Sequence, residues 1–261
     1  GVSKGLVHEA IARAINMDRA VIEERLMGDF SPDPDWLDRL KAPVTQDELD
    51  AKPLPFLLAN PMSESEISAL NPTDVLVEYN WDGIRAQLIK THETIRLWSR
   101  GDQDITEQFP DIVEVATTLP SQIILDGEIL AGTTEHLQTF NDLQTRLNRK
   151  RITQTLLKTH PAFFKAYDLL RLDGEDLRGH PLIARKAALR KITVSQSLTI
   201  HPMCSESIHA MRQEARGKGA EGVMIKGKQS CYVGGRKAGH WWKWKLDPMT
   251  ADCVLIYAQA G

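Results

Sequence analysis

Charged and aromatic side chains interrupt or end several apolar, strand-like segments of this sequence. Residues 78–85 read Glu-Tyr-Asn-Trp-Asp-Gly-Ile-Arg, and Asp126 and Glu128 flank a glycine inside a run of aliphatic residues. Ionised carboxylates inside apolar strands are costly unless they are paired or hold a cation. We therefore expect these groups to face one shared cleft.

Two lysines alternate with tryptophans in the segment Trp-Trp-Lys-Trp-Lys at residues 241–245. Side chains on a strand alternate between its two faces, so Lys243 and Lys245 share one face and the intervening tryptophan points to the other. Two ammonium groups on one face can clamp a phosphate. An edge strand with solvated lysines would show the same pattern, but the acids Glu128 and Glu221 elsewhere in the chain favour the clamp.

The composition is that of an ordinary folded protein. The 261 residues carry a net charge of -3, with 42% hydrophobic and 26% charged residues, which excludes disordered and collagen-like chains. Residues 1–50 hold six basic and eleven acidic residues, whereas residues 221–245 hold six basic and one acidic. The late basic cluster could meet the phosphates of a nucleotide or of a nucleic acid, or it could be a solvated face.

Targeting signals and cysteine pairs are lacking in the sequence. Cys204, Cys231 and Cys253 form no Cys-x-x-Cys pair, so neither a disulfide framework nor a zinc cluster is indicated. No apolar run reaches the ~18 residues that cross a bilayer, and no signal peptide is recognisable. We expect a cytoplasmic, nucleoid-associated protein without a membrane partner.

The segments that must position these residues divide into three parts. Short helices are expected in residues 1–50, beginning near Ser3, Asp18 and Asp35. Residues 42–72 are proline-rich and predict an irregular linker. Beyond them, strands are predicted at 75–79, 84–91, 94–99, 122–130, 162–170, 198–203, 222–226, 241–245 and 251–258, and helices at 110–119, 140–147, 182–192 and 208–216. The fold class is α+β, and the Asp82-Gly83 turn indicates a hairpin in an antiparallel meander.

The motifs resemble, in their order, those of ATP-dependent DNA ligases. Between Glu78 and Lys245 the chain carries Glu-x-Asn-x-Asp-Gly-x-Arg, Ser-Arg, Asp-Gly-Glu, Tyr-Asp-Leu-Leu, Glu-Gly-Val-Met-Ile-Lys and Trp-x-Lys-x-Lys. One Asp-Gly-x-Arg is a weak signal, but the ordered set is specific. The resemblance implies the nucleotidyltransferase fold of DNA ligases and mRNA capping enzymes, with ATP-grasp-like antiparallel sheets flanked by helices.

The resemblance implies a reaction in three steps. A lysine attacks the α-phosphate of ATP, AMP passes from this lysyl-AMP to a 5′-phosphate at a nick in double-stranded DNA, and the 3′-hydroxyl displaces AMP from the DNA-adenylate. Such transfers depend on positioning and charge neutralisation. The implied cofactors are ATP, bound as AMP after the first step, and Mg²⁺ or Mn²⁺.

The resemblance also assigns roles to individual residues. Glu78 corresponds to the acid that recognises the adenine amino group, and Tyr167 to the aromatic ring that stacks on the purine, although an ordinary core tyrosine would fit the sequence too. Met224 would lie against the other side of the base, where a core methionine is almost as good a reading. Arg85 and Arg100 correspond to contacts with the ribose and with phosphates, including the 5′-phosphate at the nick.

Acids and lysines complete the implied site. Glu128 and Glu221 correspond to ligands of the divalent ion and to ribose contacts, because Mg²⁺ prefers carboxylates and water; structural salt bridges are the alternative. Lys243 and Lys245 would neutralise the α-phosphate in the transition state. Asp82 is interpreted as a turn former rather than as an acid in the chemistry.

Asn80 stands where the family has its nucleophilic lysine. The lone pair of an amide nitrogen is delocalised into the carbonyl group and cannot form the phosphoramidate. We therefore expect that this chain cannot self-adenylate but still binds ATP or AMP. An introduced substitution, a natural degenerate copy and a sequence error are three possible origins of Asn80.

The resemblance divides the chain into three regions. Residues 1–45 correspond to the end of a helical DNA-binding domain, 46–247 to the adenylation domain, and 248–261 to the first strand of a truncated OB-fold domain. In the family that domain supplies a basic motif that orients the pyrophosphate leaving group, so slow self-adenylation is expected even with lysine at position 80. We expect a monomer whose grip on nicked double-stranded DNA is reduced.

Two other functions fit part of the pattern. An RNA ligase or a GTP-using capping enzyme would share the nucleotidyltransferase motifs and differ in nucleotide or end preference. A non-catalytic module that binds a nucleotide or nicked DNA would account for Asn80 directly.

Overall fold

The computed structural model describes residues 4–17, 19, 22, 26, 34–41, 50–92, 94–149, 151–192, 198–200 and 207–247. Its strands are β1 Leu57–Leu58, β2 Asn60–Pro61, β3 Val75–Trp81, β4 Ile84–Lys90, β5 Ile95–Ser99, β6 Ile123–Ala131, β7 Ala162–Leu172, β8 Glu175–Asp176, β9 Leu198–Ile200, β10 Ala220–Gly227, β11 Gly235–Arg236 and β12 Trp241–Lys245. Its helices are α1 Lys4–Ile15, α3 Trp36–Lys41, α5 Glu64–Ser68, α6 Pro110–Ala116, α7 Phe140–Leu147, α8 Gln154–Thr159, α9 Leu182–Leu189 and α10 Ile208–Ala215. Short 3₁₀ turns cover Pro72–Asp74, Thr106–Gln108 and Arg216–Lys218.

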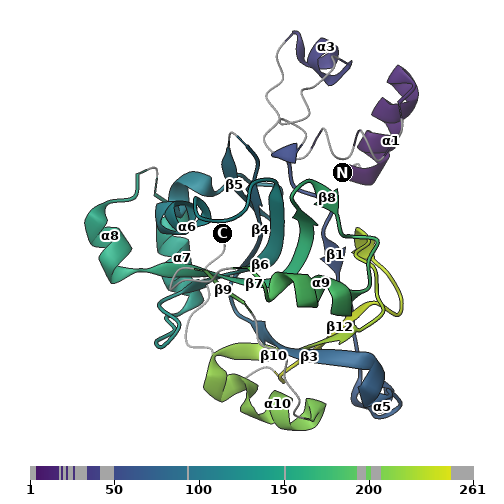
Figure 1. Cartoon of the computed structure of the whole chain (residues 1–261), viewed down its shortest axis with the longest axis vertical. Helices are drawn as coiled ribbons and strands as arrows, with labels where there is room; N and C mark the ends of the chain where they lie inside the picture. Colours follow the sequence, from purple (N-terminus) through teal and green to yellow (C-terminus); the bar gives the residue numbers. More distant parts are fainter. Residues whose placement is uncertain are drawn as a thin grey trace, which may run out of the picture.

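The strands form two main sheets (Figure 1). The larger sheet has the order β5-β4-β6-β7-β8, with β9 added beside β7, and the smaller sheet has the order β2-β12-β10-β3. Most pairs are antiparallel, whereas β2 with β12, β7 with β9 and the separate pair β1 with β11 are parallel. The predicted α+β class with antiparallel sheets flanked by helices is confirmed.

The predicted hairpin at Asp82-Gly83 is wrong. β3 pairs with β10 in the smaller sheet, and β4 pairs with β5 and β6 in the larger one. The turn is therefore the crossing point between the two sheets. A Cβ atom on Gly83 would lie 2.4 Å from the carbonyl oxygen of Ile129, so only glycine allows the chain to pass this close to β6.

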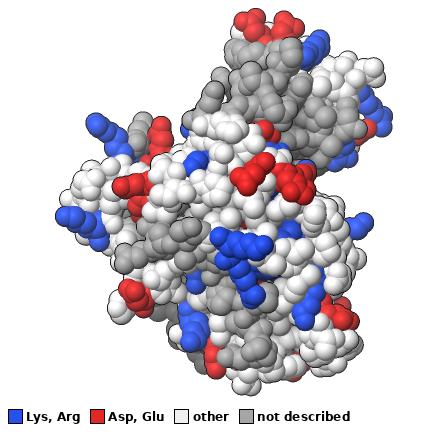
Figure 2. All heavy atoms as spheres, in the orientation of Figure 1, with Lys and Arg blue, Asp and Glu red and all other residues white. Residues whose placement is uncertain are grey.

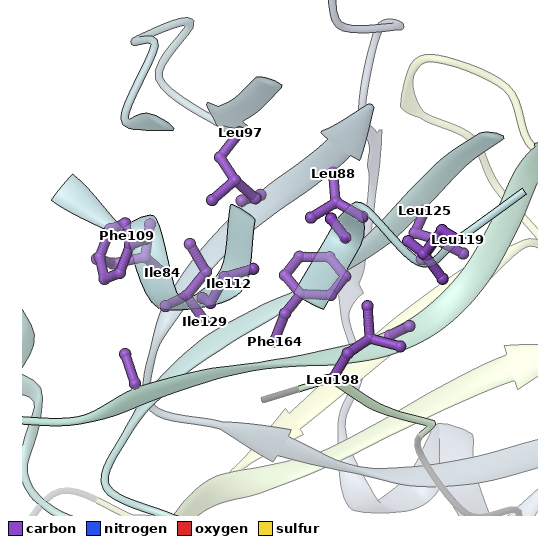
Figure 3. Packing of buried hydrophobic residues seen from close by; sticks show 14 of the residues in the cluster. Ile84, Leu88, Leu97, Phe109, Ile112, Leu119, Leu125, Ile129, Phe164 and Leu198 are labelled. Atoms are coloured by element: carbon purple, nitrogen blue, oxygen red, sulfur yellow. The ribbon is translucent and has the colours of Figure 1, made fainter. Parts of the chain in front are cut away.

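The larger sheet is apolar on both faces because successive residues of its central strands alternate between two cores. Leu88 and Leu125 belong to the core under α6 and α7, together with Phe109 and Phe164 (Figure 3). Their chain neighbours face the other core, which lies toward the smaller sheet and contains Ile89, Ile124, Leu170, Tyr167, Tyr232 and Trp241.

The outer face of the smaller sheet is closed by α10. Val77 of β3 and Val223 of β10 pack with Ile208 and Met211 of that helix. Trp242 and Trp244 lie against the same cluster. This confirms that Trp242 and Trp244 take the face opposite to Lys243 and Lys245.

The segment 42–72 is only partly an irregular linker as predicted. Within its described part, β1 and β2 add parallel edges to β11 and β12, and α5 begins with a capping box between Ser63 and Glu66. The backbone of Leu54 exchanges hydrogen bonds with the side chain of Gln87 on β4, at 2.7 and 2.8 Å. The described part of the segment therefore packs against both main sheets rather than forming a separate linker.

Helix boundaries mostly follow the sequence prediction. α7 has the predicted bounds, and α6, α9 and α10 begin where predicted and end one to three residues earlier. α8 and α5 were not predicted, since each is short and lacks a helical apolar stripe. The helix expected from Asp18 falls largely outside the described residues, and the strand expected at 251–258 lies wholly outside them. No described helix is long and apolar enough to cross a membrane.

Candidate active site

A cleft of about 900 Å³ lies between the inner face of the smaller sheet and the larger sheet. Strands β3, β4, β6, β7, β10 and β12 contribute to its lining. All the predicted site residues line it: Glu78, Asn80, Arg85, Arg100, Glu128, Tyr167, Glu221, Met224, Lys243 and Lys245. Groups that are up to 167 positions apart in the chain thus share one cavity.

Asn80 lies beside an acid and a lysine. Its amide nitrogen Nδ2 is 3.5 Å from Oε2 of Glu221, and Nζ of Lys245 is 2.5 Å from the same oxygen. These side chains meet because Gly222 of β10 is paired with Asn80 on one side and with Lys245 on the other. Gly222 has a φ of +147°, and a Cβ atom there would lie 2.3 Å from the carbonyl oxygen of Trp244.

Asp82 also lines the cleft, beyond its role in the turn. Partial burial raises the pKa of its carboxyl group, and the negative charge of Glu221 raises it further. The residue that we interpreted only as a turn former therefore adds an acid to the same corner.

Glu128 is a half-buried carboxyl group on β6, directly across the ladder from Arg85. Burial raises the pKa of Glu128 to about 8, and the charges of Asp126 and Glu221 act in the same direction. Arg85 and Arg100 oppose the shift without cancelling it. The neighbouring Gly127 has to be glycine, because a Cβ atom there would lie 2.5 Å from the ring of Phe164.

The acids of this corner fit a divalent cation. Burial, and then the negative charge of Glu221, raise the pKa values of Asp82 and Glu128, and a cation nearby would oppose both shifts. Among the described residues no group of three or more metal-binding side chains converges on one point. Mg²⁺ usually takes one or two carboxylates and completes its shell with water and substrate phosphates.

Arg85 has a partner inside the fold that the sequence did not reveal. Its guanidinium donates to both carboxylate oxygens of Asp126, at 3.2 and 2.8 Å, and only 12% of its side chain is exposed. The rings of Phe56, Trp241 and Tyr167 surround it, with centroids 5.1, 5.5 and 5.8 Å from Cζ. Arg85 thus organises the cleft wall in addition to lining the cavity.

The inner end of the cleft contains a buried ionic cluster. Lys226 Nζ is 2.6 Å from Oε2 of Glu78, and Lys186 forms an ion pair with Oε1 of the same carboxylate. The Lys226 ammonium lies 4.2 Å from the ring centroid of Tyr167 and 4.0 Å from that of Trp241. Burial lowers the pKa of Lys226 to about 8, although Glu78 opposes the shift.

Lys226 and Lys186 were not predicted as site residues. Strand alternation could have found Lys226, because it lies two positions after Met224 on β10 and shares its face. Lys186 gives no such signal, since it reaches Glu78 from a helix that packs on the other sheet.

The mouth of the cleft carries several cations. Slight burial and the charges of Lys245, Arg236 and Arg100 lower the pKa of Lys243. Lys243, Arg236 and Arg100 form no ion pair with a carboxylate in the part of the chain that the structure describes. Arg236, on β11, was not predicted and adds a positive charge available to an anionic ligand.

Comparison with known proteins gives a consistent match. Residues 56–245 match the family model described as "ATP dependent DNA ligase domain". The DNA ligase of Pyrobaculum islandicum is 30% identical to this chain, in a match that covers the whole chain and 47% of that ligase. The DNA ligase of Haloarcula marismortui is 29% identical, in a match that covers the whole chain and 49% of that ligase. It spans about half the length of the curated relatives it matches.

Solved structures show the same relationship. A mycobacterial DNA ligase D complexed with ATP and MES superposes with a TM-score of 0.59 at 26% identity, over 77% of this chain and 62% of that one. The ligase domain of LigD from M. tuberculosis gives a TM-score of 0.59 at 27% identity, over 77% of this chain and 61% of that one.

Proposed function

Because the chain belongs to the family of ATP dependent DNA ligase domains, we propose that it is the adenylation core of an ATP-dependent DNA ligase whose substrate is nicked double-stranded DNA. The observation that carries the proposal is the convergence of every predicted site residue on one cleft. We further propose that the chain acts as a monomer at the bacterial or archaeal nucleoid, where repair, replication and recombination leave nicks.

The inner end of the cleft suits adenine. The 6-position of adenine donates hydrogen bonds and the neighbouring ring nitrogen N1 accepts one, whereas guanine presents a 6-oxo acceptor beside an N–H donor. Glu78 accepts and Lys226 donates, so this pair matches adenine when the carboxylate faces the amino group. Guanine presents the opposite pattern of donor and acceptor, so it would leave Glu78 and Lys226 without hydrogen-bond partners on the base. Unpaired buried polar groups give the strongest discrimination between two bases.

Tyr167 and Met224 supply the apolar surfaces of the base site. Only 9% of Tyr167 is exposed, and Met224 packs against the same cluster. An aromatic ring contributes about 1–3 kcal/mol when a base stacks on it. Stacking requires the base to enter beside Lys226, which lies over the same ring.

The mouth of the cleft suits the triphosphate. Lys243 and Lys245 would neutralise the α-phosphate, and Arg100 and Arg236 would contact the outer phosphates or the 5′-phosphate at a nick. Fixed cations aimed at a reacting phosphate stabilise the charge that develops there. Glu128 and Glu221 would hold Mg²⁺, whose chemistry is to neutralise phosphate oxygens.

Asn80 removes the covalent part of this chemistry. Its side chain lies beside Glu221, at what we propose to be the acceptor position, and its amide nitrogen carries no basic lone pair. The expected state of this chain is therefore a noncovalent ATP or AMP complex. A non-catalytic module that binds a nucleotide or nicked DNA is the second candidate function, and Asn80 is the observation that favours it.

Calorimetric titration with ATP and Mg²⁺ tests the proposal. We expect saturable binding with one site per chain and weaker binding for Lys226→Met. Lys228→Met is the control, because this lysine is two residues further along the chain but binds the backbone oxygen of Thr73 outside the cleft. An absence of ATP binding at millimolar concentration would refute the proposal.

A further inference from the structure

Lys186 lies behind the cleft rather than in its wall. Only 2% of its side chain is exposed, and it does not line the cavity. Its ammonium pairs with Oε1 of Glu78, while Lys226 binds Oε2. Lys186 belongs to α9, which packs on β7 of the larger sheet, and Glu78 belongs to β3 of the smaller one. The contact therefore connects the two sheets behind the cleft.

Two positive charges surround the single negative charge of Glu78. The residue that precedes Lys186 on α9, Arg185, donates two hydrogen bonds of 2.8 Å to Asp168. Glu78 pairs with two lysines, both almost completely buried. Burying an ammonium group is costly, and one lysine is enough to neutralise one carboxylate. The second lysine needs a further explanation.

The geometry of the carboxylate supplies one. With one lysine on each oxygen, the plane of the Glu78 carboxylate is fixed, and each oxygen retains a lone pair for a further donor. Without Lys186, Oε1 would lose this ion pair, and the carboxylate could turn so that both oxygens face Lys226. Lys226 would then donate its remaining N–H groups to Glu78 instead of to a ligand.

We propose that Lys186 is a positioning residue for purine recognition, which holds Glu78 so that Glu78 and Lys226 together read the 6-position and N1 of adenine. The inference rests on the proposed function, because it requires an adenine nucleotide at the inner end of the cleft. It adds to that function a residue that contacts no ligand and yet sets the base preference.

The test compares ATP with inosine triphosphate (ITP), which carries a 6-oxo group where ATP carries the amino group. Both are titrated in the presence of Mg²⁺ into the wild type, Lys186→Met and Lys186→Arg. We expect Lys186→Met to weaken ATP binding by about tenfold, as expected for one hydrogen bond to a charged group. ITP binding should change much less, so the preference for ATP falls. Lys186→Arg should restore most of it.

Control variants distinguish a role of Lys186 in positioning Glu78 from a role in stabilising the fold. Lys191→Met removes an exposed lysine just beyond α9 and should leave both affinities unchanged. Thermal melting establishes that each variant is folded. If Lys186→Met does not fold, Lys186→Gln, which keeps a hydrogen-bond donor but no charge, is measured instead and should show a smaller loss of preference in the same direction.

The outcomes are distinct. An unchanged ratio of ATP to ITP affinity in a folded Lys186 variant, or an equal loss for both nucleotides, would overturn the positioning role. A double variant with Glu78→Gln should be no worse than Glu78→Gln alone, since Lys186 acts through Glu78. Failure of the wild type to bind either nucleotide would refute the proposed function itself.

Discussion

The side chain at position 80 determines what the cleft can do with a nucleotide. Asn80 is surrounded by groups that suit an adenylate: an acid and a lysine lie at its side, and cations line the mouth of the cavity. Lys245 is paired with Glu221 and Lys226 with Glu78, so neither is free to replace the lysine that we expect at this position. We therefore expect nucleotide binding without covalent capture in this chain.

Metal binding should depend on pH through Glu128. Its pKa of about 8 means that the metal-free carboxyl group holds a proton at neutral pH, whereas Mg²⁺ needs the carboxylate. In the presence of ATP, Mg²⁺ affinity should rise by up to about tenfold per pH unit below this pKa and level off above it. Calorimetry in buffers of different ionisation enthalpy should detect the released proton.

The raised pKa of Glu128 also determines whether folding stability rises or falls with pH. Between the ordinary value of 4.5 and about 8, the folded metal-free protein binds a proton that the unfolded chain has released. This contribution to stability is present below pH 4.5 and is lost as pH rises toward 8. Glu128→Gln should remove both trends, and the exposed Glu107→Gln should keep them. Mg²⁺ affinity that does not change over this range would contradict the assignment.

At the scale of elements, the sequence was informative wherever periodicity was strong. β12 and α7 have the predicted bounds, and alternation correctly separated Lys243 from Trp244. The pairing of β3 with β10 was not predictable from Asp82-Gly83, because the same turn residues serve a hairpin and a crossing between sheets. β1 and β2 span two residues each and show no period at all.

Candidate site residues were predictable only where a motif marked them. Lys186 escaped because its contact with Glu78 depends on how α9 packs across two sheets. Arg236 escaped because its two-residue strand is defined by pairing with β1 rather than by its own pattern. Long-range packing, and not local propensity, places both side chains.

Gly222 should be essential to the element geometry of the site. A methyl group there would lie 2.3 Å from the carbonyl oxygen of Trp244, at a φ of +147°. Gly222→Ala should lower the free energy of unfolding by about 2–4 kcal/mol through overpacking and backbone strain. Gly179→Ala, with no atom within 4 Å of its Cβ, should change it by less than about 0.5 kcal/mol. Equal urea midpoints for the two variants would refute this reading.

At the scale of the whole molecule, charge is distributed unevenly around the cleft. Many described arginines have a carboxylate partner, such as Arg178 with Asp176 or Arg212 with Asp247. Arg100 and Arg236 line the cleft without one in the described chain. Figure 2 shows basic and acidic groups interspersed over much of the face in view.

DNA binding should reflect these two arginines. For a nicked duplex, the logarithm of the association constant should fall linearly with the logarithm of salt concentration, by about 0.9 per phosphate contact. Removing Arg100 or Arg236 by alanine substitution should reduce the slope by about one each. Arg178→Ala, which removes an exposed but paired arginine, should leave the slope unchanged. Fluorescence anisotropy at several salt concentrations measures it, and parallel lines for all variants would contradict the assignment.

The most direct test is the intact mass of the protein after incubation with ATP and Mg²⁺, for the wild type and for Asn80→Lys. We predict that the wild type keeps its mass while binding ATP noncovalently, and that Asn80→Lys gains the mass of one AMP at the new lysine. An AMP adduct on the wild type, or none on a folded Asn80→Lys that binds ATP after long incubation, would contradict the proposal that position 80 is the acceptor site, where we expect slow but detectable adenylation.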